Sequence, residues 1–470
     1  MLEIFGAFIG FILAIYAGIY IYFSYRHSYW SRKGVPVPDG WEFFWGHFKY
    51  LIKDDYLNVR QLMEWSKKCP KYFGILKGHS NVLVISDPDM VHEVLVKKFE
   101  YFHGREMHPM QDTPEENPDR VNIIFARGLH WKRLRTISNP IFSVSNLKKI
   151  MPTMVDTVDH VLDYMETICD KPLDIHKVFQ ELTMDVICRV AFGQQGCKIF
   201  KNPYIDSARH IFTAPVLQLT NTWIVRFPIL KKLFKFKAKY FGETFKVSED
   251  LHVQLHSEIM ERKKRKHEKK ENIDFIDLFL EAEVDSQFCE SEDNVLDKMN
   301  LKVSKELNVA EIVGQCFIFL LAGYDTTANS LSFLCYELIN NPDALRQLQE
   351  EIDDFTISDS FTYESISKLR YLDACIKESL RLHPIAASVV NRRCMNSTTI
   401  GEVFVEKGTD VEIDVLTLNF SESLWGSEPE KFRPERWLES ETRHQSAFLT
   451  FGAGPRICLG KRLALFEEKI

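Results

Sequence analysis

The longest uncharged stretch of the chain lies near the N-terminus, from Ile4 to Phe23, and reads IFGAFIGFILAIYAGIYIYF. At 1.5 Å per residue this helix would span about 30 Å, the hydrocarbon thickness of a bilayer. Arg26 and Arg32 follow the stretch, whereas only Glu3 precedes it. The positive-inside rule then predicts an uncleaved, single-pass membrane helix with the rest of the chain in the cytosol. The alternative, a cleavable signal peptide, would have a basic leader and a shorter apolar run.

The remainder of the chain has mainly helical periodicity with short strand-like runs. A proline-bearing hinge, residues 34–40, is followed by an alternating strand-like run at 81–87 and by a helix pattern with proline near its start at 88–99. Further helix patterns begin at residues 128 and 371, and each ends at a proline, Pro140 and Pro384. With no internal repeats, the pattern predicts a mainly α protein with small β-sheets, divided into an anchor (1–30) and one large domain (31–470).

One predicted helix, residues 308–343, is apolar on every side and carries almost no charge before Asp325. Asn308 and Glu311 have the spacing of a capping box at its start. Such a helix should cross the protein core. An acid and an alcohol, Asp325 and Thr326, are costly there unless paired, and they could relay protons to a ligand. Gly323 just before them would allow close approach of a flat ligand or a local widening of the helix. The alternative is a satisfied polar kink without chemistry.

Three charged segments allow only less specific interpretations. Residues 213–241 mix large apolar groups with lysines, which is compatible either with contact to a membrane surface or with two ordinary helices over a core. The basic run 261–272 is interpreted as a solvated helix end or loop and the acidic run 283–297 as a linker.

The overall charge and the cysteines exclude some classes of function. The formal net charge of -7 gives no indication of a nucleic-acid partner. None of the ten cysteines forms a CxxC pair, and their irregular spacing argues against zinc ribbons and a disulfide framework.

Two groups of residues near the C-terminus are candidates for a buried ion-pair network and for a metal ligand. Glu378 and Arg381 share one face of a predicted helix, and with Arg436 they could form a buried network that is structural rather than catalytic. Cys458 lies in FGAGPRICLG, where Gly452, Gly454 and Gly460 would let the backbone turn tightly and bring N–H groups toward sulfur. A sulfur held in this way could be a thiolate ligand of iron.

These segments together resemble the cytochrome P450 superfamily, in particular its microsomal, haem-thiolate monooxygenase branch. FGAGPRICLG fits the haem-binding signature, AGYDTT the oxygen-activating motif, ESLR the E-x-x-R motif, FRPERW the PERF-like motif and WKRLR the W-x-x-x-R clamp. The five motifs occur in the family's order, and the resemblance covers roughly residues 30 to 470. It implies the cytochrome P450 fold, preceded by one transmembrane helix.

The resemblance also implies an activity: insertion of one oxygen atom from O2 into a hydrophobic substrate such as a xenobiotic, a steroid or a fatty-acid-like molecule. The cofactor would be haem b, with electrons from NADPH through NADPH–cytochrome P450 reductase and cytochrome b5 as a second candidate partner. The location would be the endoplasmic reticulum membrane. Carried over by position, Cys458 would ligate the iron and Asp325 and Thr326 would deliver protons. The propionates would be held by Trp131, Arg135, Arg392, Arg456 and Arg105, and the substrate would face Ile318, Leu321 and Ala322.

Two departures from the family pattern limit these expectations. Asn419 and Ser421 stand where the family often has His-x-Asp. Family members also usually continue beyond the cysteine helix, so the chain is expected to be truncated at its C-terminus. The alternatives to a monooxygenase are therefore a haem-binding but catalytically silent isoform or sensor, and a haem-thiolate isomerase, which the acid–alcohol pair disfavours.

Overall fold

The structure is a computed structural model that describes residues 2–53, 56–107, 111–168, 171–213, 219–264, 274–281, 307–358, 361–439 and 442–470. The acidic run 283–297 and most of the basic run 261–272 lie outside these residues. The helices are α1 (Leu2–His27), α2 (Tyr29–Arg32), α3 (Arg60–Lys68), α4 (Pro88–His92), α5 (Gly128–Ser138), α6 (Val144–Thr167), α7 (Ile175–Phe192), α8 (Ile205–Thr213), α9 (Leu219–Arg226), α10 (Lys231–Phe241), α11 (Glu243–Lys264), α12 (Phe275–Glu281), α13 (Val309–Asn340), α14 (Pro342–Ser358), α15 (Tyr363–Ile366), α16 (Arg370–Leu382), α17 (Val415–Asn419), α18 (Glu422–Trp425) and α19 (Lys461–Glu467).

Short 3₁₀ turns connect several of these helices, and η2 (Glu93–Lys97) continues α4 as a π-helix. The 3₁₀ turns are η1 (Phe48–Leu51), η3 (Pro118–Arg120), η4 (Asn139–Phe142), η5 (Pro228–Leu230), η6 (Ala387–Val390), η7 (Pro434–Trp437) and η8 (Gly454–Arg456). The predicted helix that starts at Pro88 is therefore present, with Asp87 accepting hydrogen bonds from the N–H groups of Asp89 and Met90 at its start.

The sheets are small. One has the order β3-β4-β8-β5, and the pairs β1-β2 and β6-β7 stand apart. Strand β4 pairs antiparallel with β3 and parallel with β8, which lies more than 300 residues later in the chain. The strands are β1 (Ile52–Lys53), β2 (Tyr56–Leu57), β3 (Tyr72–Lys77), β4 (Ser80–Ile85), β5 (Arg392–Arg393), β6 (Thr398–Ile400), β7 (Val403–Val405) and β8 (Asp410–Ile413). The prediction of a mainly α protein with small sheets is confirmed.

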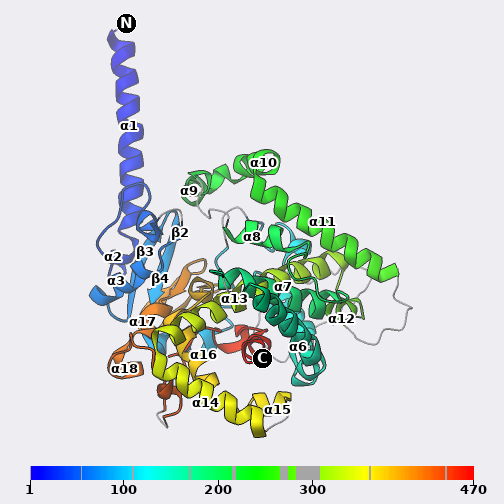
Figure 1. Ribbon diagram of the computed structural model, residues 1–470. Coiled ribbons are helices and arrows are strands. Elements are labelled where there is room, and N and C mark those ends of the chain that lie inside the picture. Colours follow the sequence, from blue (N-terminus) through cyan, green and yellow to red (C-terminus); the bar gives the residue numbers. More distant parts are fainter. Residues whose placement is uncertain are drawn as a thin grey trace.

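Helix α13 forms the centre of the main hydrophobic core and packs along α7 (Figure 1). Its first turn carries the predicted capping box, because Asn308 accepts from the Glu311 N–H while the Glu311 carboxylate accepts from the Asn308 N–H. Among the described residues, two helices are long and apolar enough to cross a membrane: the Ile9–His27 part of α1 and the whole of α13. Since 56% of the most apolar window of α13 is buried, α13 is a core helix, whereas only 6% of the α1 window is buried.

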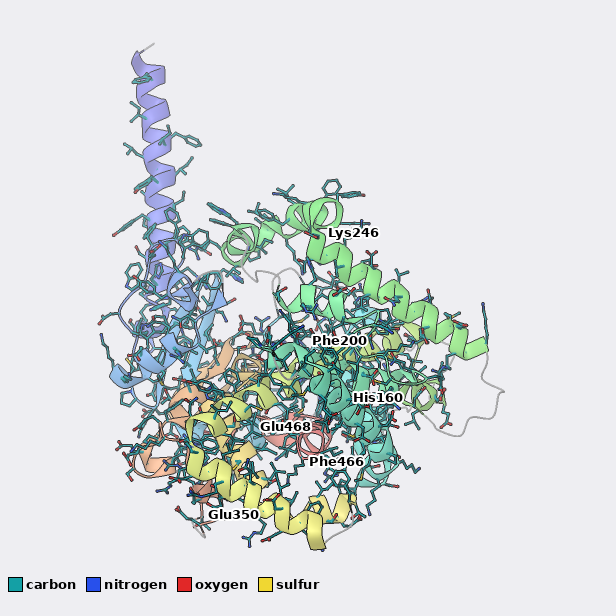
Figure 2. All side chains as sticks on the ribbon, in the orientation of Figure 1. His160, Phe200, Lys246, Glu350, Phe466 and Glu468 are labelled. Carbon is teal, nitrogen blue, oxygen red and sulfur yellow. The ribbon has the colours of Figure 1, made fainter. Side chains whose placement is uncertain are left out.

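Helix α1 projects from the body beside the β-rich side, and its upper side chains have no neighbours in the body (Figures 1 and 2). Helices α9 and α10 project on the same side. The C-terminal helix α19 instead lies within the helical part, where Phe466 and Glu468 are surrounded by other side chains. The N-terminal helix is thus largely exposed, whereas the C-terminal helix packs within the body.

Candidate functional site

Cys458 lies in a tight loop between η8 and α19. The backbone N–H of Cys458 donates to the carbonyl of Phe451 across 2.8 Å, which closes the loop. Gly454 has φ +68°, and a Cβ there would lie 2.0 Å from the Leu95 carbonyl oxygen of η2. Only glycine allows both this conformation and this approach. Gly452 also has a positive φ, but Gly460 has φ −82°, so Gly460 needs no special backbone freedom.

Cys458 is accessible although its thiol is surrounded by protein atoms. Of the eight cysteines among the described residues, Cys458 is the only exposed one. Burial nevertheless raises the pKa of its thiol, while the backbone N–H of Gly460 and the charge of Arg135 act in the opposite direction. The accessible surface of Cys458 therefore lies within the protein body, where backbone donors and cations would stabilise a thiolate.

Arg456 within this loop and Arg392 near it are both buried, and neither is paired with a carboxylate among the described residues. Arg392 is 1% exposed and Arg456 5% exposed. The Nε and Nη2 atoms of Arg392, and the Nε atoms of Arg456 and Arg105, are buried and have no hydrogen-bond partner among the described residues. Burial, followed by mutual repulsion, lowers the pKa of Arg392 and Arg456 well below the usual arginine range. Uncompensated buried cations are costly unless a bound anion completes the site.

These arginines fit the propionates of haem, the cofactor that the family resemblance implies. Arg456 donates to the carbonyl of Ile124 across 3.0 Å, and its guanidinium carbon lies 4.9 Å from the centre of the Trp131 ring. Burial lowers the pKa of both Arg105 and Arg135, and the charge of Cys458 opposes this effect only in part. The arrangement therefore combines an accessible thiol with cations suited to a ligand that carries two carboxylates.

The acid–alcohol pair lies where α13 meets α7. Asp325 is 20% exposed, and its Oδ1 accepts from Gln180 Nε2 across 2.8 Å and lies 3.6 Å from His176 Nε2. The Thr326 hydroxyl donates to the Ala322 carbonyl at 2.7 Å. The helix stays α-helical through this turn, so the expectation of a widened helix is wrong. Gly323 instead lets α7 approach, because a Cβ there would lie 3.0 Å from Ile187.

The three residues expected to face substrate differ in exposure. Ala322 is exposed in the middle of the core helix, and Ile318, one turn earlier, is half-buried. Together with Thr326 they follow a spacing of four residues, which places them on one face of α13. Leu321 is 7% exposed and belongs to the main hydrophobic core. The accessible stripe of α13 is therefore formed by Ile318, Ala322 and Thr326.

Glu378, Arg381 and Arg436 are brought together and fully buried. The two Glu378 oxygens accept from Arg381 at 2.9 and 2.7 Å, and one of them also accepts from Arg436 at 3.2 Å. The remaining guanidinium nitrogens donate to backbone carbonyls, including those of Asn419 and Glu428. This network ties α16 to the segment from α17 to η7, which precedes the cysteine loop.

Several residues of the site were not predicted from the sequence. Trp437 Nε1 donates to Glu378 at 2.9 Å, and Gln180 holds Asp325. His103 is buried beside Arg456, and burial with the neighbouring Arg456 lowers its pKa to about 4. No local sequence pattern marks these residues, because the partner of each lies far away in the sequence.

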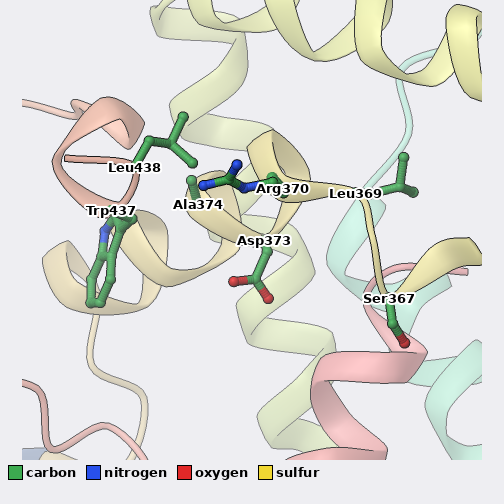
Figure 3. A pocket seen from close by; sticks show the side chains of 7 residues that line it. All are labelled: Ser367, Leu369, Arg370, Asp373, Ala374, Trp437 and Leu438. Atoms are coloured by element: carbon green, nitrogen blue, oxygen red, sulfur yellow. The ribbon is translucent and has the colours of Figure 1, made fainter. Parts of the chain in front are cut away.

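A separate surface pocket of about 170 Å³ does not include the predicted site residues (Figure 3). It lies beside α16, where the Arg370 and Asp373 side chains point toward it. Its lining consists of Ser367, Leu369, Arg370, Asp373, Ala374, Trp437 and Leu438.

Comparison with known proteins assigns these motifs to one family. The family model described as Cytochrome P450 matches residues 35–470. The chain is 39% identical over 467 residues to putative cytochrome P450 CYP13A8 of Caenorhabditis elegans, covering 97% of this chain and 91% of that protein. It is 40% identical over 475 residues to putative cytochrome P450 CYP13A2 of the same organism, covering 98% and 91%.

Proposed function

Because the chain belongs to the cytochrome P450 family of haem-thiolate monooxygenases, we propose that it inserts one oxygen atom into a hydrophobic organic substrate with electrons from NADPH through a reductase. The observation that carries this proposal is the accessible thiol of Cys458 near arginines whose buried nitrogens have no partner among the described residues. Haem, when bound, supplies the activation of molecular oxygen.

The roles of this chain's residues follow from their positions. Cys458 would ligate the iron, and the N–H groups of Gly460 and Lys461 would stabilise its negative charge. Arg392 and Arg456 would pair with the propionates, together with Arg105 and Arg135. Trp131 packs against the guanidinium of Arg456 and keeps it oriented.

Asp325 and Thr326 would move protons at the other wall of the site. The Asp325 carboxylate is held by Gln180 and remains partly accessible, so it can exchange protons with water. The Thr326 hydroxyl donates to a backbone carbonyl and keeps an acceptor lone pair for an incoming proton donor. Ile318 and Ala322 offer an apolar surface to the substrate on the same face of α13.

We further propose that α1 anchors the protein in the endoplasmic reticulum membrane, with the catalytic domain in the cytosol. Its exposed side chains include Phe11, Leu13 and Ile15, which are 48 to 64% exposed. Helices α9 and α10 support this orientation, since α10 buries no described side chain and exposes Leu233 and Phe236 among its lysines. Of the two meanings considered for residues 213–241, contact with the membrane surface therefore fits better.

The test of the proposed function is the carbonyl difference spectrum of the reduced full-length protein. We expect the red-shifted band of thiolate-ligated haem, and we expect Cys458→Ala to abolish it. Cys69→Ala is the matched control, because Cys69 is a half-buried cysteine at the end of α3, outside the predicted site, and should leave the band unchanged. Absence of the band in the wild type would refute the proposal. A normal band without NADPH-dependent oxygen consumption would favour the silent haem-binding alternative.

The proton role of Thr326 has its own test. Thr326→Ala should retain the carbonyl band but raise the peroxide formed per NADPH consumed several-fold, because proton delivery is impaired. Ser332→Ala is the matched control, since its hydroxyl makes the same bond to a carbonyl four residues earlier on the same helix. Equal peroxide yields in the two variants would remove the proton role.

A further inference from the structure

Three segments meet at the base of α1, at the level where the helix joins the body. Arg226, at the end of α9, donates from Nη1 to the carbonyl of Gly78 across 2.7 Å. Arg26, near the end of α1, donates to the carbonyl of the next residue, His79. The His79 N–H in turn donates to the carbonyl of Val225 at 3.1 Å. The turn between β3 and β4 thus holds two arginines from distant parts of the chain close together.

These two arginines have unused donors. Arg226 is only 4% exposed, yet its Nε and Nη2 atoms have no hydrogen-bond partner among the described residues, and the same holds for the Nε atom of Arg26. The Arg226 guanidinium lies 3.8 Å from the centre of the Phe23 ring. A cation–π contact compensates only part of the cost of burying a charge and satisfies none of the N–H groups.

The electrostatic environment of the pair is positive. Burial, with Arg26 as a repulsive neighbour, lowers the pKa of Arg226 to about 10. Burial also lowers the pKa of His79, and the three charges that add to this effect are those of Arg26, Arg393 and Arg226. Arg393 already pairs with Asp410 at 2.7 Å. Among the described residues no carboxylate is paired with Arg26 or Arg226, so the pair lacks a counter-charge.

Aromatic side chains lie beside this positive cluster. Tyr20 stacks on Phe43 with ring centres 5.5 Å apart, and Trp223 packs edge-on against Trp45 at 5.3 Å. Trp223 is 43% exposed. Amphipathic aromatic rings are typical of the level of lipid headgroups. The cluster therefore combines unpaired guanidinium groups with side chains suited to the membrane–water interface.

We propose that Arg26 and Arg226 form a binding site for the phosphate group of an anionic phospholipid in the cytosolic leaflet. The inference rests on the proposed anchoring of α1. The planar Nε–Nη2 edge of Arg226 matches two phosphate oxygens, and Arg26 Nε offers a further donor. Soluble phosphate has the same chemistry, but the position beside α1 and its aromatic surroundings favour a lipid. The bound headgroup would neutralise the cluster and fix the orientation of the body on the membrane.

The test uses the full-length chain in phosphatidylcholine bilayers with trace spin-labelled phosphatidic acid or spin-labelled phosphatidylcholine. The fraction of motionally restricted label measures the selectivity for the anionic headgroup. We expect the wild type to select phosphatidic acid, and Arg226→Gln to weaken its association about tenfold or more, the effect of losing a charge-assisted hydrogen bond. Arg226→Lys should give an intermediate selectivity, because it keeps the positive charge but loses the planar edge that donates to two phosphate oxygens.

Two further variants serve as an alternative to Arg226→Gln and as a control. Arg26→Gln should also reduce the selectivity, and it serves where Arg226→Gln disturbs folding, because Arg26 is half-buried on the end of α1. Lys237→Gln is the matched control: it removes one charge from exposed α10 and should change the selectivity little.

Three results would overturn the proposal. They are no selectivity in the wild type, equal losses in Arg226→Gln and Lys237→Gln, and loss of selectivity on addition of millimolar inorganic phosphate at constant ionic strength. The last result would assign the site to soluble phosphate. Retention of the chain in pure phosphatidylcholine bilayers after a salt wash reports on α1 separately, so failure of the anchor is distinguishable from failure of the site.

Discussion

The network around Glu378 allows a quantitative prediction of stability. Glu378→Gln keeps the size of the side chain but removes its charge, and it leaves the guanidinium groups of Arg381 and Arg436 without a counter-charge. All three side chains are at most 1% exposed. The Gln amide would also present N–H donors to the donors of the arginines and of Trp437. Breaking a buried ion pair in this way costs about 3 to 5 kcal/mol.

The expected shift in melting temperature follows from the size of the domain. The entropy of unfolding is about 2.1 cal/mol/K per residue, or about 0.9 kcal/mol/K for the roughly 440 residues after α1. The loss in Glu378→Gln therefore corresponds to a fall in the thermal midpoint of about 3 to 5 °C. Differential scanning calorimetry of the haem-loaded protein, at fixed haem content and scan rate, measures it.

The matched control is Glu64→Gln on α3. Glu64 pairs with Lys67 at 2.7 Å, but its side chain is 55% exposed. An exposed pair of this kind contributes less than about 0.5 kcal/mol, so the midpoint should move by less than about 1 °C. If Glu378→Gln melts within the same narrow range as Glu64→Gln, the network does not stabilise the fold and the reasoning is refuted.

Two further predictions concern the loop and the start of α13. Gly454→Ala should prevent stable haem loading, measured by haem content after gel filtration, whereas Gly408→Ala, with φ +88° and open space, should load normally; equal loading would exclude the backbone clash. Burial raises the pKa of Glu311, but hydrogen bonds from His130 and Arg133 outweigh it and lower the pKa to about 2. Because this folded-state pKa is below the ordinary 4.5, the stabilisation is complete at neutral pH and is lost as the pH falls from about 5 toward 2, on the order of 1 kcal/mol by pH 4. Glu311→Gln should show a correspondingly smaller loss of urea stability between pH 7 and pH 4, and identical pH profiles would contradict the assignment.

Much of the site could be predicted because its signals are local. Cys458 and its glycines stand within ten residues of one another, and the capping box at Asn308 depends on a spacing of three. The apolar run of α1 needs no partner in the chain to be recognised. In these cases the backbone requirement or the composition of one segment already restricts the structure.

Other features required the tertiary structure. Gly323 illustrates the difference, since the sequence marks a position without a side chain but does not say what approaches it. The structure places Ile187 of α7 there. Gln180 is another case, because an ordinary helix glutamine becomes the partner of Asp325 only when α7 packs on α13.

The sequence by itself therefore determined the long apolar N-terminal helix, the core helix with its acid and alcohol, and the cysteine loop, because each is encoded in consecutive or periodically spaced residues. Only the tertiary structure decided which cations remain without partners. Arg392 and Arg456 around the thiol, and Arg26 and Arg226 at the base of α1, come from segments far apart in the chain. Whether an arginine is paired depends on packing between such segments, and local periodicity carries no information about that packing.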